Sequence, residues 1–402
     1  MHAAPRRLST VLRRLSLAVG LSVASGAGLA EGAMAAPGAP GAVYSMTNDA
    51  VGGNSITTFD RAADGTIRQR ADVPTGGDGT GTPEDSANGL IQANVGGESS
   101  PTNFQGNEKF LLALNGGSDS ISVFRTDGAE LEQVDLEPSG GDRPISITVN
   151  KGVAYVLNAG GPMCTGFPST PTITGFTFNA QGQLTPIPGS TRPLSGIPNS
   201  GCTQVAFDKT GSVVFVEEQQ ADVITSYTRN ADGTLSGPTP QQSTGNGPFG
   251  LNFTQRNQLL TTENFGAAPG QGGLASYAIN ERTGTLTPLS PTVRNGQSDT
   301  CWVAITDNNE YAFTSSFGDD GGISSYRVRP DGSLELLNGQ AATVGAGSSD
   351  VTLSGNSRYL YVKNSLQGTV TTFQIEDDGA LAQIDQDRDA SMGGGSIGIA
   401  GH

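Results

Sequence analysis

Short runs in which apolar and polar residues alternate recur along most of the chain, and seven of them share one pattern. Each contains an aromatic residue, a few polar residues, a glycine and then a return to aliphatic residues. Alternation with a period of two predicts half-buried β-strands, and a polar pair ending in glycine predicts the turn of a β-hairpin. The seven turn glycines are Gly65, Gly128, Gly182, Gly233, Gly284, Gly332 and Gly379.

The spacing of these turns indicates the architecture. Successive turn glycines lie 47 to 63 residues apart. This period is that of a propeller blade, and no long amphipathic helical pattern interrupts it. We therefore predict an all-β protein, a seven-bladed β-propeller of four-stranded antiparallel blades, formed as a single domain by residues 37–402.

Individual strands can be assigned within the blades. Blade 3 is the clearest, with PISITVN from Pro144, VAYVLN to Asn158, TITGFTF from Thr172 and QLTPIPG from Gln183. In blade 2 the run 75–106 is polar and rich in glycine, and 90–93 is the segment expected to form its innermost strand. Blade 1 has only three strands of its own. The C-terminal segment 396–400 is therefore predicted to pair with blade 1 and to close the ring, which removes the exposed edges of an open array.

The first 36 residues are predicted to be a secretion signal peptide. Two Arg pairs, at 6–7 and 13–14, precede an apolar stretch, and cleavage is expected near Ala35–Ala36. The mature protein is then expected to be secreted, periplasmic or at the cell surface, and monomeric. No later run is apolar for long enough to span a bilayer. A formal net charge of −16 disfavours nucleic acid as a partner, because phosphate binding needs clustered Lys and Arg.

The three cysteines can be placed on the predicted blades. Antiparallel alternation puts the loops between second and third strands on the same face as the connections between blades, where the central channel opens. Cys164 lies in such a loop of blade 3 and Cys202 in the connection that enters blade 4, so a Cys164–Cys202 disulfide is predicted. Cys301 enters blade 6, two blades on. It is expected to be a small buried residue, with a reactive thiol as the alternative.

Histidine is almost absent from the chain, which limits the chemistry. His2 lies in the signal peptide and His402 is the last residue. This argues against Ser-His-Asp and Cys-His nucleophiles and the usual zinc sites, so no metal and no cofactor are predicted. Glu218 ends the second strand of blade 4 at the channel mouth, either as a functional carboxylate or as an acceptor for loop amides. Arg143, which enters blade 3, is either a ligand-binding cation or an ion-pair partner that anchors a loop.

The repeated unit resembles a known family. It is visible as GVAYVLN, as SRYLYVKN with VTTF, and as NEKFLLALN with SISVF. These motifs resemble the seven-bladed lactonase-fold propellers, which include bacterial 6-phosphogluconolactonases and fungal 3-carboxymuconate lactonizing enzymes, over about residues 42–400. The resemblance implies a site with basic residues at the inner strands, a Glu after one second strand and an Arg after the next.

This chain keeps only part of that site. The matching Glu is Glu218, and the Asn that precedes the expected Arg is Asn264. The positions expected to hold basic residues carry Thr203, Gln204, Phe265 and Cys301. Those cations would hold an anionic substrate and polarise a lactone carbonyl.

From this loss we expect a degenerate catalytic site that binds a small molecule, a glycan or a protein at the channel mouth. The residues expected to bind the ligand are Arg143, Thr203, Gln204, Asn264, Phe265, Cys301 and Trp302. One alternative is an active lactone hydrolase or lactonizing enzyme with altered specificity, in which Glu218 is the general base. Another is a structural propeller of the cell envelope.

Overall fold

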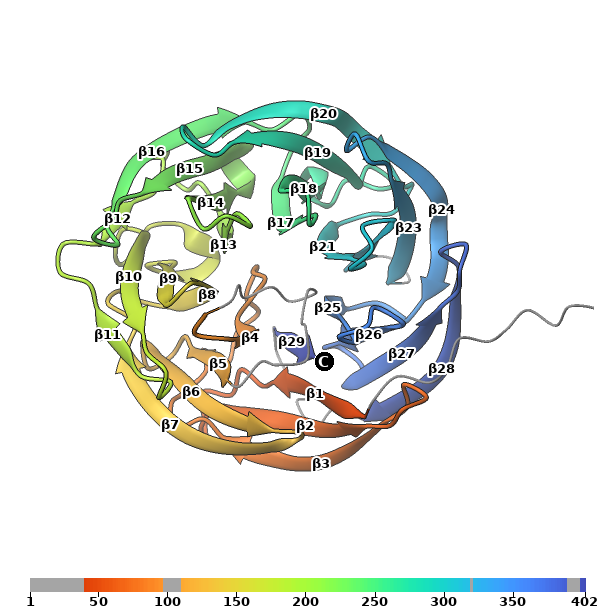
Figure 1. The fold of residues 1–402 in the computed structure, drawn as a ribbon, viewed down its shortest axis with the longest axis horizontal. Helices are drawn as coiled ribbons and strands as arrows, with labels where there is room; N and C mark the ends of the chain where they lie inside the picture. The colour runs from red at the N-terminus through yellow and green to blue at the C-terminus, as the bar shows by residue number, and fades with distance from the viewer. Residues whose placement is uncertain (1–39, 97–109, 319–320, 389–397) are drawn as a thin grey trace, which may run out of the picture. The chain divides into compact units, whose positions relative to one another are not determined.

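The computed structural model describes residues 40–96, 110–318, 321–388 and 398–402, which belong to one compact unit of the chain. In these ranges the chain forms β-strands and three short 3₁₀ turns, and the strands build seven antiparallel sheets around a centre (Figure 1). The predicted all-β, seven-bladed propeller is confirmed. No helix in the described ranges is both long and apolar enough to cross a membrane.

Blades 1 to 3 contain the first twelve strands and the last one. The strands of blade 1 are β29 (Ile399–Gly401), β1 (Gly41–Met46), β2 (Ser55–Arg61) and β3 (Ile67–Pro74). Blade 2 consists of β4 (Leu90–Ala93), β5 (Phe110–Asn115), β6 (Ser120–Asp127) and β7 (Glu130–Pro138). Blade 3 consists of β8 (Pro144–Asn150), β9 (Val153–Asn158), β10 (Thr172–Phe178), β11 (Leu184–Pro186) and β12 (Arg192–Pro193).

Blades 4 to 7 each have four strands. Blade 4 consists of β13 (Cys202–Phe207), β14 (Val213–Glu218), β15 (Val223–Arg229) and β16 (Leu235–Gln242). Blade 5 consists of β17 (Pro248–Phe253), β18 (Gln258–Glu263), β19 (Gly273–Asn280) and β20 (Thr285–Arg294). Blade 6 consists of β21 (Thr300–Ile305), β22 (Tyr311–Ser316), β23 (Gly322–Val328) and β24 (Leu334–Thr343). Blade 7 consists of β25 (Ser348–Leu353), β26 (Tyr359–Asn364), β27 (Thr369–Ile375) and β28 (Leu381–Arg388). The 3₁₀ turns are η1 (Pro162–Cys164), η2 (Gln219–Ala221) and η3 (Phe265–Ala267).

The two ends of the propeller meet in blade 1, as predicted. Strand β29 pairs antiparallel with β1, with Tyr44 opposite Ala400. The backbone N–H of Ile399 also donates to the carboxylate of Asp350 on β25, at 3.2 Å, so the last strand is tied to blade 7 as well. The observed strand starts at 399, and residues 396–397 of the predicted closing segment lie outside the described ranges.

The turn glycines have the conformation that the hairpins require. All seven have φ between +55° and +89°. A residue with a β-carbon adopts this left-handed region at a cost of about 1 kcal/mol, and glycine does so freely. The turn of one blade also contacts its neighbour, because the Tyr155 hydroxyl on β9 donates to the Gly233 carbonyl of blade 4 at 2.6 Å. The recurring glycine therefore serves the turn and the contact between blades.

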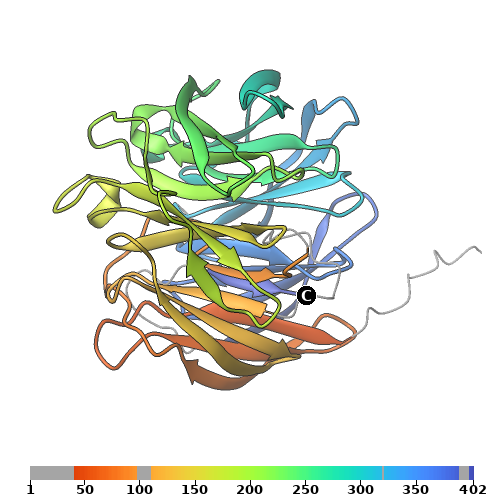
Figure 2. The ribbon, with the colours of Figure 1, turned by 60° about the vertical axis from the view of Figure 1, so that its left-hand side comes forward.

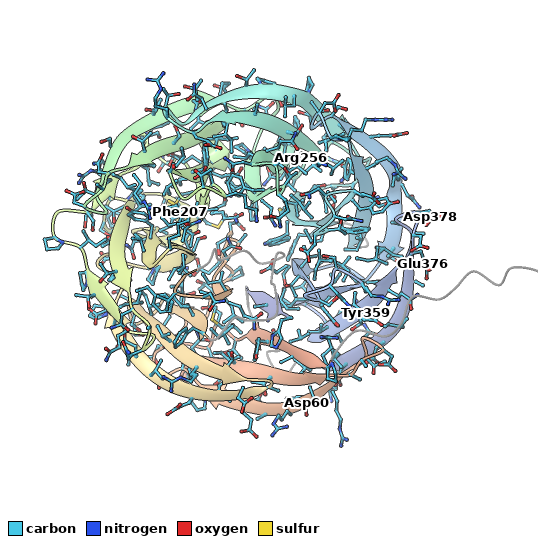
Figure 3. The ribbon with its side chains drawn as sticks, in the orientation of Figure 1. Asp60, Phe207, Arg256, Tyr359, Glu376 and Asp378 are labelled. Carbon is cyan, nitrogen blue, oxygen red and sulfur yellow. A yellow bond between two sulfur atoms is a disulfide. The ribbon has the colours of Figure 1, made fainter. Side chains whose placement is uncertain are left out.

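The hydrophobic core lies between the blades. The described residues form seven apolar clusters, and each joins one blade to the next. Figure 3 shows Phe207 and Tyr359 inside the ring, whereas Glu376 and Asp378 lie on its outer edge. Phe207 packs between blades 3 and 4, and Tyr359 between blades 7 and 1. Each blade is thus stabilised by its neighbours, which is typical of repeat architectures.

Blade 3 differs from the prediction at its outermost strand. The expected continuous strand from Gln183 is divided into β11 and β12, which both pair with β10. Pro186 and Pro188 lack the N–H that a ladder needs, and Gly189 has φ of +70°, so the chain leaves the sheet between the two pieces.

The predicted disulfide is present. Cys164, in η1, is bonded to Cys202 at the start of β13, with their Cα atoms 5.3 Å apart. The bond joins the long loop after β9, which projects on the left in Figure 2, to blade 4. Cys301 is free and buried, as expected.

Candidate functional site

A cavity of about 460 Å³ lies at the predicted channel mouth, among the ends of second strands and the starts of inner strands. We call it the mouth cavity. Its acidic side chains are Glu84, Asp85 and Asp299, and its aromatic walls are Phe249, Trp302 and Phe317. The amides of Gln219, Gln220 and Asn264 contribute further polar groups. None of the described residues that line it is Lys, Arg or His, so the cavity combines apolar walls with negative charge.

The acids Glu84 and Asp85 belong to the segment 82–88, which crosses the inner ends of several blades. The Trp302 indole N–H donates to the Ser86 carbonyl at 3.1 Å, tying the segment to blade 6. The Ala87 N–H donates to the Thr203 carbonyl at 3.2 Å in blade 4, and the Ile147 N–H of blade 3 donates to the Asn88 carbonyl at 3.1 Å. This part of the polar run therefore contributes Pro83, Glu84 and Asp85 to one wall of the cavity.

Glu84 is held by the one basic residue expected near the mouth. An Arg143 guanidinium nitrogen lies 2.5 Å from a Glu84 carboxylate oxygen, and both side chains are largely shielded from solvent. Burial raises the pKa of Glu84, and the opposing attraction of Arg143 is smaller. Arg143 does not line the cavity. Of its two predicted roles, the ion-pair partner that anchors a loop is the one the geometry supports.

Among the described residues that line the cavity, no Lys, Arg or His lies beside Asp85 and Asp299. Burial raises the pKa of both carboxyls, and the charge of Asp299 raises the pKa of Asp85 further. Asp85 accepts a hydrogen bond from the Gln219 amide at 3.3 Å, and Asp299 accepts one from the Cys301 thiol at 3.3 Å. Burial also raises the pKa of the Cys301 thiol, so this cysteine is a neutral thiol at pH 7 and a poor nucleophile.

The backbone position of Asp299 is unusual for an aspartate. In blades 1, 4, 5 and 7 the residue just before the inner strand is a glycine with positive φ. In blades 3 and 6 the same place is taken by Arg143 and Asp299, both with φ of 58°. Non-glycine residues held in this region cost about 1 kcal/mol or more, and such strain concentrates at functional positions.

A second cavity of about 440 Å³ adjoins the first. We call it the side cavity. It shares Gln219, Gln220, Asn264 and Gly266 with the mouth cavity. Its own lining adds Asn246, Phe265 and Gln271 together with Asp222.

Of the residues predicted to bind a ligand, four lie at these cavities. Cys301 and Trp302 line the mouth cavity, Phe265 lines the side cavity, and Asn264 lines both. Asn264 donates to the Gln219 side chain at 2.7 Å and accepts from the Gly266 N–H at 2.9 Å, which fixes the wall between the cavities.

Thr203 and Gln204 have a different position. The Thr203 hydroxyl donates to the Phe249 carbonyl at 2.7 Å. The Gln204 amide exchanges two hydrogen bonds with the backbone of Leu251, at 3.0 and 2.7 Å. Both side chains are buried and join the inner strands of blades 4 and 5. Their polar groups are occupied within the ring, and neither lines a cavity.

Glu218 is likewise buried and lies outside both cavities. Its carboxylate accepts hydrogen bonds from the Ser195 hydroxyl at 2.6 Å, the Ser195 N–H at 3.2 Å and the Thr225 hydroxyl at 2.5 Å. Ser195 belongs to the connection that enters blade 4. These contacts match the predicted alternative of an acceptor for loop groups, and the catalytic role of Glu218 stays a prediction that rests on the resemblance.

The equivalent position has the same role in other blades. Glu263 ends β18 and accepts from the Ser243 hydroxyl at 2.6 Å and the Gly245 N–H at 2.7 Å. Asn364 ends β26 and donates to two carbonyls of the connection that enters blade 7, both at 2.8 Å. The last residue of the second strand thus anchors the incoming connection of its own blade.

Sequence reasoning named none of the three acidic residues of the mouth cavity. Glu84 and Asp85 lie in a run without periodicity, and Asp299 was passed over in favour of its neighbour Cys301. A signal did exist for Asp299, because a charged residue there replaces a recurrent glycine. Within the described ranges no group of three or more His, Cys, Asp and Glu side chains is placed to hold a metal ion.

Comparison with known proteins agrees with this architecture. The family model described as "Lactonase, 7-bladed beta-propeller" matches residues 42–297 and 264–394. The chain therefore belongs to the lactonase family of seven-bladed β-propellers.

One curated relative is the 6-phosphogluconolactonase of Bacillus subtilis (strain 168), which is 36% identical over 80 residues. That alignment covers 20% of this chain and 22% of the relative, about a fifth of each. The periplasmic gluconolactonase of Pseudomonas aeruginosa has a similar structure, with a TM-score of 0.69 and 16% identity over 90% of this chain and 99% of that one. The structure of a candidate 6-phosphogluconolactonase from Bacteroides fragilis has a TM-score of 0.68 and 16% identity, over 90% of this chain and 98% of that one. Identities at this level show a shared fold.

Proposed function

We propose that this lactonase-family propeller is exported and that its mouth cavity binds a small polyhydroxy molecule which is uncharged or positively charged. The observation that carries the proposal is the lining of the cavity. Three carboxyls and three side-chain amides surround the space between Phe249, Trp302 and Phe317. Concave sites with apolar walls and a few convergent polar groups are the usual form of small-molecule sites.

The charge of the lining argues against phosphorylated or carboxylated ligands. Such anions are held by Arg or Lys through charge-assisted hydrogen bonds. The expected basic positions carry other residues, and Arg143 is already paired with Glu84. In a site of low dielectric the uncompensated carboxylates would repel an anion. A hydroxyl-rich neutral molecule can instead donate to Asp85 and Asp299.

One hydroxyl group of the mouth cavity is available to form a hydrogen bond with a ligand. The Ser349 hydroxyl lines the mouth cavity, is buried, and has no hydrogen-bond partner within the described part of the chain. Leaving a buried hydroxyl unpaired costs about 1–3 kcal/mol. A bound hydroxyl group would remove that cost, which supports a polar ligand over a purely structural role for the mouth.

A second candidate function is hydrolysis of a neutral lactone in the same cavity. The observation that favours it is the pair of buried carboxyls, because burial raises the pKa of Asp85 and Asp299 toward the range useful for general acid–base catalysis. In such a reaction one carboxylate takes a proton from water as the water oxygen bonds to the carbonyl carbon. The ring C–O bond then breaks, and the leaving oxygen receives a proton.

Export is supported by the N-terminal sequence and by the Cys164–Cys202 disulfide, since disulfides persist in oxidising compartments. The test is N-terminal sequencing of the protein recovered from the periplasm or the culture medium. We expect a mature chain that starts near Ala36 or Pro37. An intact N-terminus confined to the cytoplasm would contradict export.

The ligand proposal is tested by calorimetric titration with D-glucono-δ-lactone, D-glucosamine and 6-phospho-D-gluconolactone, together with assays of lactone hydrolysis. We expect the phosphorylated lactone to bind at least tenfold more weakly than the other two. Asp299→Asn should weaken binding about tenfold, and Glu218→Gln should leave the affinity of the folded protein unchanged. Tightest binding of the phosphorylated lactone would overturn the proposal.

Turnover distinguishes the two candidates. Hydrolysis that disappears in Asp299→Asn would establish the second candidate. Hydrolysis that disappears in Glu218→Gln, in a variant that melts like the wild type, would return the catalytic role to Glu218.

A further inference from the structure

The side cavity shares one wall with the mouth cavity, and its chemistry differs from that of its neighbour. Gln219, Gln220 and Asn264 line both spaces, so the two cavities adjoin and are separated only by these side chains and Gly266. The side cavity has one carboxylate in place of three, and it has two further amides in Asn246 and Gln271.

Both oxygens of that single carboxylate already accept hydrogen bonds within the protein. Asp222 accepts hydrogen bonds from the Asn246 amide at 2.8 Å and from the Gly247 N–H at 2.8 Å. The described residues that line the side cavity include no Lys, Arg or His. The described lining therefore carries one carboxylate beside five side-chain amides, those of Gln219, Gln220, Asn246, Asn264 and Gln271.

The amides of the side cavity can both donate and accept. The Gln220 and Gln271 side chains are exposed and form no hydrogen bond within the described ranges. Each side-chain amide offers two donors and a carbonyl acceptor, a combination that suits hydroxyl groups, which also donate and accept. An ammonium or a carboxylate would use only half of this capacity.

The 3₁₀ turn η3, which lies between the two cavities, has a strained backbone. Phe265 and Ala267 both adopt left-handed backbone conformations, with φ of 53° and 58°. The Arg294 guanidinium lies over the Phe265 ring, 3.6 Å from its centroid. Strained, non-glycine turns of this kind persist where the surroundings hold them and are concentrated at ligand sites.

We propose that the side cavity is a second subsite for an uncharged oligosaccharide, whose first sugar unit occupies the mouth cavity and whose next unit contacts Asn246, Phe265 and Gln271. This inference rests on the proposed function of the mouth cavity and names the class of its ligand. An extended peptide is the other polymer able to occupy the mouth cavity and the side cavity together. The five side-chain amides of the lining, with a single carboxylate and no described Lys, Arg or His, favour the sugar chain.

The test starts from an array of neutral oligosaccharides of one to six units, followed by calorimetry of the best-binding series at one and two units. We expect the two-unit ligand to bind at least tenfold more tightly than the one-unit ligand, which corresponds to about 1.4 kcal/mol. Gln271→Ala, and separately Ala268→Phe, which fills the side cavity, should remove that gain and leave the one-unit affinity unchanged. Gln181→Ala, an exposed glutamine in a distant hairpin turn, is the matched control.

The outcomes separate the two proposals. If the one-unit ligand binds and no longer ligand binds more tightly, the side cavity is no subsite and the proposed function stands. If no carbohydrate binds at all, both proposals fail. Binding of extended peptides that is lost in Gln271→Ala, without oligosaccharide binding, would assign the cleft to a peptide partner.

Discussion

The ion pair between Arg143 and Glu84 provides a quantitative test of how the mouth cavity is built. The two charged groups are 2.5 Å apart, and their side chains are only 15% and 6% exposed. Removing one partner of such a buried pair leaves an uncompensated charge and costs about 3–5 kcal/mol. We therefore expect Arg143→Ala to lower the free energy of unfolding by this amount at pH 8. For a domain of this size, that loss lowers Tm by about 4–6 °C.

The loss should depend on pH in a defined direction. Folding raises the pKa of Glu84, so the folded state binds this proton more readily than the unfolded state. Protonation of Glu84 therefore stabilises the folded state at low pH. This contribution is lost as the pH rises through the pKa that Glu84 has in the folded protein. Without the attraction of Arg143 that pKa rises further, so the substitution should cost less stability at pH 5 than at pH 8.

The assay is thermal and urea unfolding at pH 5 and pH 8, with hydrogen exchange at the Ala87 amide to detect local release of segment 82–88. Arg125→Ala is the matched control, because its pair with Glu132 is exposed and should contribute less than about 1 kcal/mol at either pH. Arg143→Ala with unchanged stability and unchanged exchange at pH 8, or with equal losses at both pH values, would refute the reasoning.

Three further predictions concern other parts of the molecule. Replacing Cys164 and Cys202 by Ser removes a cross-link between residues 38 positions apart. The free energy of unfolding, measured with urea, should fall by about 4 kcal/mol, and a loss below about 1 kcal/mol would contradict this. Deleting 399–402 removes β29 and opens the ring, so calorimetry should show a lower and less cooperative melting transition, and an unchanged Tm would argue against closure by this strand. Asp299→Gly should retain or slightly raise Tm, because glycine adopts the positive φ of this position without strain. The same change should weaken ligand binding at least tenfold, and a drop in Tm without loss of binding would show a structural role.

Most of the fold could be predicted because it depends on local, repeated signals. The turn glycines specify one hairpin per blade, and the orphan segment at the C-terminus follows from counting strands. Even the weakly marked 90–93 was placed correctly, since each blade needs an inner strand. The divided outer strand of blade 3 was missed because Pro186 and Pro188 are compatible with an extended chain and remove only its ladder hydrogen bonds.

The candidate site was predictable only in part, for a physical reason. Asn264, Cys301 and Trp302 adjoin strand ends, so the blade layout places them at the mouth. Glu84 reaches the same cavity through an irregular segment whose path depends on hydrogen bonds between distant residues, and no sequence period encodes such a path. Glu218 was singled out through the resemblance, whereas its anchoring role follows from the hydrogen bonds that it and its equivalent Glu263 accept from their incoming connections.

The central claim is that the mouth cavity takes a ligand without negative charge, and intrinsic fluorescence tests it most directly. Trp302 is the single tryptophan of the chain and lines the cavity, so its emission reports on this site alone. Titration with D-glucono-δ-lactone should change the emission in a saturable way, and 6-phospho-D-gluconolactone should require at least tenfold higher concentrations. A saturable change that the phosphorylated lactone produces at lower concentration than the neutral one would contradict the account.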